Sequence, residues 1–356
     1  NMEINRVDTA AQLTLVPADQ AARWEVAYGV YGTALQDMPH ILTDNVDVTL
    51  HNLSLSTLYQ VYARSICAEG DTSAWCEPLS LQMPQGVPYT MPFDSTLGGW
   101  QSYTGNPADV FAGTATLKAN TLGLGWKAAD GANAFGHNHI LCDNSYQYAF
   151  WLVSPVINLM SQRGDKDLYF GIDLALTQTY NADKKNDPAA APTDTRRNAF
   201  YIAVSQDEGA TWSKADAVVW GENTADADYL YSAIPVGRGL RYYINLTRYA
   251  GKAIRIALVE DKSGTTAYTF VPTTIHVANA GLEEYNTPCF GAADVQFVAD
   301  GASVQCTIVP NDTARAWQYA YGESGFNPAE ATAYNTTEKT FRLDGLRMGT
   351  AYDVYV

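Results

Sequence analysis

An internal repeat is the feature that most constrains how this chain can fold. Residues 12–29, QLTLVPADQAARWEVAYG, align without a gap with residues 305–322, QCTIVPNDTARAWQYAYG, after a shift of 293 positions. The same shift aligns LHNLSLSTLYQVY at 50–62 with LDGLRMGTAYDVY at 343–355. Self-similarity at a fixed spacing indicates that one folding unit occurs more than once. The sequence therefore predicts two copies of one module on either side of an unrelated segment.

Strand signals dominate the whole chain. Short runs rich in Val, Ile, Tyr, Phe and Thr are separated by Gly, Asn, Asp and Pro, and we find no convincing amphipathic helix. The alternation in FYIAVS (200–205) and IRIALV (254–259) predicts strands that bury one face. Because hydrophobic residues make up 47% of the chain and charged ones 17%, packed cores are expected. The predicted fold class is all-β.

Six strands are predicted in the first copy. Their count and spacing are typical of a small sandwich of roughly 90 residues. Trp24 is expected to pack between the two sheets, and the L-x-x-L-x-x-x-T-x-Y segment that ends at Tyr59 has the form of a tyrosine corner. The strands are MEINRV, QLTLVP, RWEVAYG, VDVTLHN, YQVYARSIC and LSLQM.

These motifs, together with C-A-E-G-D-T-S-A-W at the last hairpin, resemble bacterial fibronectin type III modules. The second copy stops at Val356, within the strand that carries Tyr352, and lacks everything that matches residues 64–83. We therefore expect an incomplete second sandwich, because a missing last strand would expose a sheet edge. We also expect a native polypeptide that continues into further domains beyond this chain.

Five cysteines, at 67, 76, 142, 289 and 306, include no C-x-x-C pair. Cys67 and Cys76 bracket a predicted hairpin, so they form either a cross-strand disulfide in an oxidising compartment or two small buried thiols. The resemblance to bacterial modules implies a different pairing for Cys289, with a partner just past Val356, and for Cys67, with a partner before Asn1.

The middle of the chain, residues 85–287, carries a second set of motifs. Their order and spacing resemble the MAM-like jelly rolls of bacterial surface proteins, namely gingipain-type cleaved-adhesin domains and the related choice-of-anchor domains. The predicted domains are thus two fibronectin type III-like modules at 1–84 and 288–356, the second truncated, flanking a jelly-roll sandwich. The motifs are MPFDSTLGGW (91–100), FWLVSPVINL (150–159), LYFGIDLAL (168–176), FYIAVSQDEGATW (200–212), INLTRYAGKAIRIALVED (244–261) and TIHVANAGLEEY (274–285).

Members of this family commonly hold calcium near a Phe-Glu and an Asp-Asn segment, through hard oxygen ligands. The corresponding pairs here are Phe93-Asp94 and Ala278-Asn279. The resemblance therefore implies Asp94 and Asn279 as the candidate Ca²⁺ ligands, although the alanine at 278 removes one carboxylate.

The octapeptide Ser205–Trp212 fits the Asp-box pattern S-x-D-x-G-x-T-W. We expect a hairpin turn in which Asp207 accepts backbone N–H groups, Gly209 adopts a positive φ and Trp212 packs beneath. Sialidases carry several such boxes, but a single copy cannot build a propeller. The pattern therefore favours a structural turn over a glycosidase.

Other chemical signals are weak. FGHNHILCD places His137, His139 and Cys142 close together, yet no fourth zinc ligand is visible, which favours an ordinary surface over a metal site. Standard catalytic motifs are absent from the sequence. Acidic residues stand mostly in segments such as SQDEG and VEDKSG, which we interpret as solvated turns, although a carboxylate pair assembled by the fold stays open.

Charge limits the partners. The chain has 22 basic and 38 acidic side chains, a net charge of −16, which argues against nucleic acid and anionic membranes. The sequence contains no run of about 18 apolar residues, so it does not predict a segment that spans a membrane. Aromatic residues reach 12%, and Tyr229 and Tyr231 lie in the long predicted loop 221–240, where such side chains bind sugars or proteins. They are the candidate ligand-binding residues.

These observations favour a non-catalytic, adhesin-like segment of a larger secreted or cell-surface protein, which binds a glycan or an extracellular protein through its middle domain. Two alternatives remain. One is a substrate-targeting accessory region of a secreted peptidase or glycoside hydrolase, and the other is a pure spacer.

Overall fold

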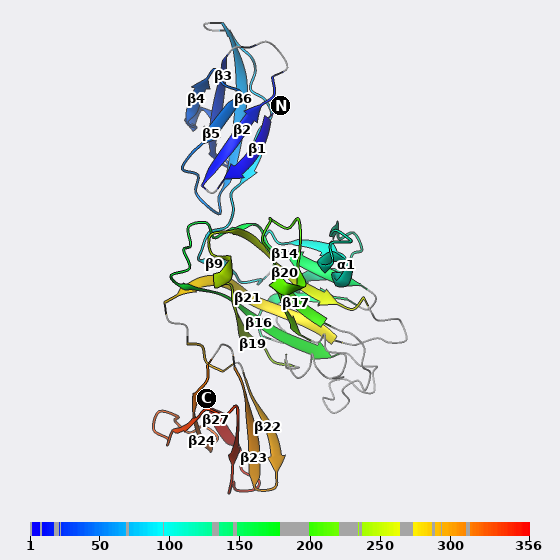
Figure 1. Cartoon of the computed structure of the whole chain (residues 1–356), viewed down its shortest axis with the longest axis vertical. Helices are drawn as coiled ribbons and strands as arrows, with labels where there is room; N and C mark the ends of the chain where they lie inside the picture. The colour runs from blue at the N-terminus through cyan, green and yellow to red at the C-terminus, as the bar shows by residue number, and fades with distance from the viewer. Residues whose placement is uncertain are drawn as a thin grey trace.

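The computed structural model describes residues 2–7, 9–17, 21, 23–68, 71–94, 96–129, 135–144, 148–178, 199–220, 234, 237–263, 273–286, 289–292, 294–310 and 314–356. The strands in these ranges form six sheets with antiparallel pairing, which confirms the all-β prediction. Figure 1 shows the two copies of the repeat at opposite ends of the molecule, with the middle segment between them. Within the described ranges, no helix has the length and apolar character needed to span a bilayer.

The first copy consists of two sheets that enclose a core containing Leu13, Trp24, Leu50 and Val61. Each of the six predicted strands overlaps an observed one, whereas β4 and β7 were not predicted. One sheet has the order β1 (Met2–Val7), β2 (Ala10–Leu15), β5 (Asp47–Leu50), and the other has the order β4 (His40–Thr43), β3 (Arg23–Val30), β6 (Leu58–Ala68), β7 (Asp71–Thr72), with β8 (Leu79–Gln82) also paired to β6.

The second copy repeats these pairings residue by residue. Leu13 pairs with Val48 in the first copy, and Cys306 pairs with Phe341 at the same positions of the second. Ala27 opposite Tyr62 likewise corresponds to Ala320 opposite Tyr355. The internal repeat is therefore a repeat of structure. Its sheets are β22 (Asp294–Asp300), β23 (Ser303–Val309), β26 (Thr340–Leu343) and β25 (Tyr334–Thr336), β24 (Trp317–Glu323), β27 (Tyr352–Tyr355).

The tyrosine corner is present in both copies. The hydroxyl oxygen of Tyr59 accepts a hydrogen bond from the backbone N–H of Ser54 at 2.9 Å. The Tyr352 hydroxyl accepts one from the N–H of Arg347 at 3.1 Å. Each bond ties the start of a strand to the preceding loop, as the motif predicts.

Cys67 and Cys76 form no disulfide, which was one of the two alternatives that the sequence left open. Both thiols are free, and Cys67 is exposed while Cys76 is partly buried. The N–H of Cys76 donates to the carbonyl of Ala63, so Cys76 lies opposite that residue and is displaced along β6 from Cys67. The hairpin register therefore keeps the two side chains apart. The other alternative, two buried thiols, does not hold for Cys67, because that side chain is exposed.

The middle segment is a β-sandwich. Two sheets face each other across a core to which Phe150, Leu152, Phe170 and Val277 belong. One sheet has the order β11 (Lys118–Ala119), β10 (Gln101–Thr104), β14 (Ala149–Val153), β20 (Ala253–Asp261), β17 (Ala199–Ser205), β18 (Ala217–Trp220), with β15 (Ile157–Asn158) paired to β20. The other has the order β12 (Gly125–Ala129), β13 (His139–Asp143), β21 (Thr273–Tyr285), β16 (Asp167–Gln178), β19 (Leu240–Asn245), with β9 (Tyr89–Met91) paired to β21.

Strands β17 and β20 differ from the prediction that they bury one face. All seven residues of β17 are buried, and the central part of β20 is buried on both sides. A second apolar cluster covers the outer face of their sheet and includes Val110, Trp151 and Trp212. Val110 belongs to the short helix α1 (Pro107–Phe111), which was not predicted and is capped by the side chain of Asn106.

Hydrogen bonds connect the first copy to the sandwich. The N–H of Gln85 donates to the carbonyl of Val156 at 2.7 Å, and the N–H of Asn158 donates to the carbonyl of Gln85, also at 2.7 Å. On the other side, the N–H of Ser56 donates to the carbonyl of Pro84 at 2.6 Å. The connecting residues are thus bonded to both units.

Candidate functional site

A hollow on the outer face of the sheet β11-β10-β14-β20-β17-β18 is a candidate binding site, because the Asp-box turn forms part of its lining. Its volume is about 440 Å³, within the usual range for small-ligand pockets. Helix α1 and the residues that follow it line one side of the hollow, and the Asp-box turn lines the other. We call it the turn pocket. Polar and aromatic side chains that line it are Tyr103, Thr116, Glu208, Thr211, Trp212 and Arg255.

Hydrogen bonds within the Asp-box hold its turn in shape. The carboxylate of Asp207 accepts from the N–H of Thr211 at 2.9 Å, from the hydroxyl of Thr211 at 2.5 Å and from the hydroxyl of Ser205 at 2.7 Å. Gly209 has φ = 94°, a conformation that glycine adopts without strain. These contacts confirm the predicted turn and its structural role.

The same contacts fix the charge of Asp207. Partial burial alone would raise the pKa of its carboxyl, but the hydrogen bonds from Thr211 and Ser205 outweigh that effect and lower the pKa. The carboxylate is therefore ionised at neutral pH and fully engaged in the turn. That engagement makes Asp207 unsuitable as a catalytic acid.

Trp212, at the end of the turn, lines the turn pocket and is only 5% exposed. Its indole Nε1–H has no hydrogen-bond acceptor in the part of the chain that the structure describes. The indole groups of Trp100, Trp126 and Trp151 all donate, at 2.6, 3.1 and 2.8 Å respectively. A buried donor without a partner is unfavourable, so the Trp212 indole N–H is a polar group beside the pocket that the described residues leave unsatisfied.

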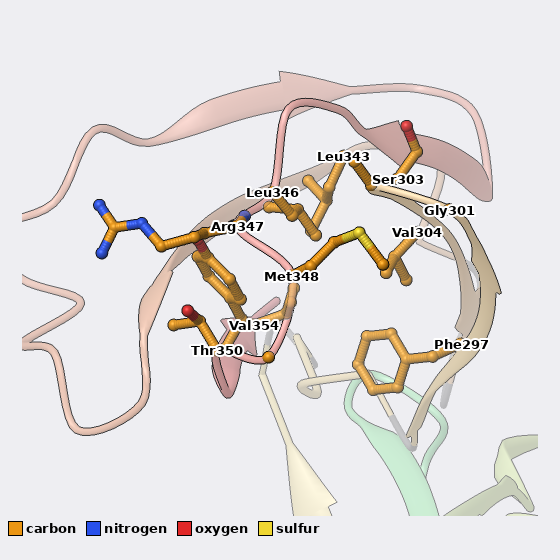
Figure 2. A pocket seen from close by; sticks show the side chains of 13 residues that line it. Phe297, Gly301, Ser303, Val304, Leu343, Leu346, Arg347, Met348, Thr350 and Val354 are labelled. Atoms are coloured by element: carbon orange, nitrogen blue, oxygen red, sulfur yellow. Dashed lines mark hydrogen bonds between the residues drawn. The ribbon is translucent and has the colours of Figure 1, made fainter.

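A second, apolar hollow of about 290 Å³ lies in the second copy of the repeat. Figure 2 shows Phe297, Leu346, Met348 and Val354 around it. Met348 is 81% exposed and Phe297 is 55% exposed. Among the described residues β27 pairs only with β24, whereas its counterpart β6 pairs with both β3 and β8.

In the first copy, side chains fill the position that corresponds to the apolar hollow. Leu81 and Met83, from β8 and the residue after it, are 2% and 0% exposed and share the core with Leu53 and Val61. Leu53 and Val61 correspond to Leu346 and Val354 after the shift of the repeat. The apolar hollow is therefore the uncovered part of the second core, as expected for an incomplete sandwich.

The predicted zinc candidates are not brought together. His139 and Cys142 are an odd number of positions apart on β13, so they lie on opposite faces of the strand. His139 instead meets a residue that the sequence did not single out, with its Nε2 at 2.8 Å from Nδ1 of His276. Within the described residues, no group of three potential metal-ligating side chains is found.

The histidine pair is buried. His139 is 0% exposed and His276 is 1% exposed, and Nε2 of His276 lies 2.6 Å from the hydroxyl of Thr177. Burial first, and then the proximity of His139, lower the pKa of His276 to about 4. His276 is therefore neutral at physiological pH. Only the fold could reveal this pair, because its members are 137 positions apart in the sequence.

Asp94 and Asn279, the calcium candidates, lie near each other. The N–H of Asn279 donates to the carbonyl of Pro92 at 3.0 Å, two residues before Asp94. However, the amide Nδ2 of Asn279 donates to Asp173 at 2.7 Å, and Arg241 contacts both Asp173 and the carbonyl of Asn279. A guanidinium thus lies against Asp173 and the backbone carbonyl of Asn279, and its positive charge disfavours a calcium ion next to these oxygens. Calcium binding stays a prediction.

Tyr229 and Tyr231, the predicted ligand-binding residues, lie outside the described residues, as does the segment 180–198. Their role stays a prediction. The sequence missed Tyr103, Glu208 and Arg255 as pocket residues. The Asp-box was the one signal that pointed to this region, because it placed Trp212 beneath a turn.

Comparison with known proteins adds no family assignment. No family model matches the chain. No curated protein matches it. Three similar solved structures are a myokine (15% identity, 24% of this chain and 94% of that chain, TM-score 0.21), the FN1–FN3 domains of chicken CNTN1 (10%, 99% and 90%, TM-score 0.21) and a carbohydrate-binding module of the β-sandwich superfamily (9%, 80% and 97%, TM-score 0.29). With such low TM-scores, none of them assigns a function. The class that the fold itself defines is an all-β protein built from sandwiches.

Proposed function

We propose that this chain is a non-catalytic, adhesin-like segment of a secreted or cell-surface protein and that it binds a glycan in the turn pocket. The observation that carries the proposal is the buried Nε1–H of Trp212, which has no acceptor among the described residues, beside a pocket of about 440 Å³. A sugar offers hydroxyl oxygens that accept such a hydrogen bond and an apolar C–H face that packs on aromatic rings.

The polar residues around Trp212 suit the same ligand. Glu208 carries an exposed carboxylate that can accept from sugar hydroxyls, and Arg255 and Thr116 add donor groups to the lining of the pocket. Mixed donors and acceptors around an aromatic floor are typical of small-molecule sites.

The pocket also supports a non-catalytic role. Glycoside hydrolysis requires two carboxyl groups that flank the scissile bond. Of the two acidic residues in the turn, Asp207 is committed to Thr211 and Ser205, so the turn does not supply the pair of carboxyl groups that hydrolysis requires. Binding without cleavage is the chemistry that this arrangement supports.

The test is a screen of the whole chain against a glycan array and a panel of extracellular-matrix proteins, with calcium and with a chelator. Hits are then measured by calorimetry on Trp212→Phe, which keeps an aromatic ring but removes the N–H, and on Glu208→Gln. Trp75→Phe, in the first copy, is the matched control. We expect Trp212→Phe to weaken glycan binding about tenfold, the equivalent of one hydrogen bond.

The outcomes separate the alternatives. Glycan binding that both pocket variants leave intact would place the site elsewhere, for instance near Tyr229 and Tyr231. Binding only in the presence of calcium would support the implied ligands Asp94 and Asn279. No binding under either condition would favour the spacer, an alternative that the hydrogen-bonded connection at Gln85 supports.

A further inference from the structure

Three polar side chains are buried together between the two sheets of the sandwich. Asn144, just after β13, is 5% exposed, and Glu260 and Lys262, at the end of β20, are 2% and 1% exposed. β13 and β20 belong to different sheets, so the cluster joins the two layers. Lysine and glutamate are almost never this buried unless they are paired. Water cannot solvate these charged groups, so contacts within the protein must account for their burial.

The contacts within the cluster are close. Nζ of Lys262 donates to the backbone carbonyl of Asn144 at 2.7 Å and lies 3.4 Å from Oε1 of Glu260. The amide Nδ2 of Asn144 donates to the carbonyl of Tyr148 at 3.1 Å. The amine, the carboxamide and the carboxylate therefore occupy one small, dry volume, whose neighbours Cys142 and Phe150 are fully buried.

An ion pair alone explains this arrangement poorly. Among the residues that the structure describes, Oε2 of Glu260 and Oδ1 of Asn144 have no hydrogen-bond partner. Unpaired buried acceptors are unfavourable, and well-packed apolar residues often replace a buried ion pair without loss of stability. A covalent product between two of the three groups would remove the amine charge and give a reason for all three residue types.

We propose that Lys262 and Asn144 become joined by an intramolecular amide bond between Nζ and Cγ, and that Glu260 moves the protons. The reaction needs an amine, a carboxamide and a proton carrier held together away from water. The amine and the carbonyl of Asn144 already touch, and the carboxamide belongs to the same residue. The carboxamide would reach Nζ by rotation about the side-chain torsions of Asn144, which breaks its hydrogen bond to Tyr148.

The proposed step is balanced without an added reagent. Glu260 takes one proton from the ammonium of Lys262, and the neutral amine attacks Cγ of Asn144, which forms the new C–N bond. A second amine proton passes through the carboxyl to Nδ2 as the Cγ–Nδ2 bond breaks. Ammonia leaves with the proton that Glu260 still holds, as ammonium, and the carboxylate is restored.

The environment favours this role for Glu260. Burial raises the pKa of its carboxyl, an effect that the nearby Lys262 partly offsets. A carboxyl whose neutral form is accessible can both accept and return a proton near neutral pH. In this reaction Glu260 touches both reacting groups and is a catalytic residue.

The decisive measurement is the intact mass of the purified, folded chain under denaturing conditions. We expect a mass lower than the sequence mass by one ammonia. Peptide mapping should then show one branched peptide that joins the segment containing Asn144 to the segment containing Lys262, with no trypsin cleavage after Lys262. A chain of unchanged mass, with both residues recovered in separate unmodified peptides, would overturn the proposal.

Variants distinguish the bond from other losses of ammonia. Asn144 precedes a serine, and a succinimide at that site would lower the mass equally but would leave two separate peptides, a result that contradicts the proposal. Lys262→Met, Asn144→Ala and Glu260→Gln should each restore the full sequence mass, whereas Lys252→Met, at an exposed lysine, should keep the ammonia deficit. Because wild-type mass alone decides the main question, a variant that fails to fold does not obscure it.

Discussion

Trp212 and Trp151 pack edge to face, with ring centroids 5.6 Å apart and an interplanar angle of 61°. Trp151 is fully buried in β14, while Trp212 ends the Asp-box turn and lines the turn pocket. This contact joins the candidate binding site to the second apolar cluster of the sandwich. A substitution at Trp151 or Trp212 should therefore change the stability of both the turn and the sheet.

Trp212→Ala should destabilise the sandwich by about 3–5 kcal/mol, because it leaves a cavity next to Trp151. Trp212→Phe should cost less, since an aromatic ring is retained and the lost N–H makes no hydrogen bond within the described part of the chain. Urea denaturation followed by circular dichroism measures both values. An alanine variant as stable as the wild type would show that Trp212 contributes no packing.

Asp207→Asn should lower the free energy of unfolding by about 1–2 kcal/mol, since the charged acceptor of the Thr211 and Ser205 hydrogen bonds is lost. Because the pKa of Asp207 is lowered on folding, its contribution is present above its unfolded pKa and is lost as the pH falls through the folded value. Thermal melts at several pH values measure this, with Asp37→Asn as an exposed control. Equal melts for the two variants would contradict the prediction.

Acid should destabilise the sandwich through the buried histidine pair. The pKa of His276 falls from its ordinary 6.5 to about 4 on folding, so below pH 6.5 the unfolded chain takes up a proton that the folded chain excludes. Stability should decrease between pH 6.5 and 4, by up to about 3 kcal/mol, and then become independent of this group. His276→Leu should make the melting temperature less dependent on pH in that window. A variant with the slope of the wild type would exclude His276 as the cause.

The two copies of the repeat provide a matched comparison of packing. Leu53 is 3% exposed in the complete core, whereas its counterpart Leu346 is only partly buried beside the apolar hollow. Leu53→Ala should destabilise the first copy by about 2–5 kcal/mol, and Leu346→Ala should cost the second copy clearly less. Hydrogen exchange resolved by peptide reports each copy separately. Equal losses of protection would mean that the second core is as well covered as the first.

Thiol labelling tests the cysteine assignments. Cys67 and Cys289 are exposed and should react with a maleimide in the native chain, whereas Cys142 and Cys306 are buried and should react only after unfolding. Burial raises the pKa of the Cys142 thiol well above its ordinary value, which slows it further. Mass mapping identifies the labelled peptides. Rapid labelling of Cys142 would contradict the packing described between the sheets.

Sequence reasoning predicted the fold well where a local pattern carries the information. The repeat predicted equal strand registers in both copies because the same residues must face the same cores, and Tyr59 and Tyr352 confirm it with the same backbone hydrogen bond. The Asp-box turn was equally predictable, since Asp207 and Gly209 act within a single turn.

Contacts between distant segments were not predictable in this way. β17 was expected to bury one face, but helix α1 and Trp212 cover the other. The Asp-box predicted that Trp212 packs beneath its turn, but no local signal showed that Trp212 and α1 meet on this face of the sheet. Glu260 was interpreted as part of a solvated turn and is instead 2% exposed, so that prediction was wrong. The interpretation rested on local composition, which cannot show that β20 continues to Asp261 and that Glu260, near its end, is buried.

The connection at Gln85 has a mechanical consequence. Its backbone lies in a parallel bridge with Ile157, flanked by two hydrogen bonds of 2.7 Å, while Pro84 is bonded to Ser56. Rotation of the first copy against the sandwich would have to break these backbone hydrogen bonds. The connection therefore opposes free swivelling of the first copy relative to the domain that holds the turn pocket.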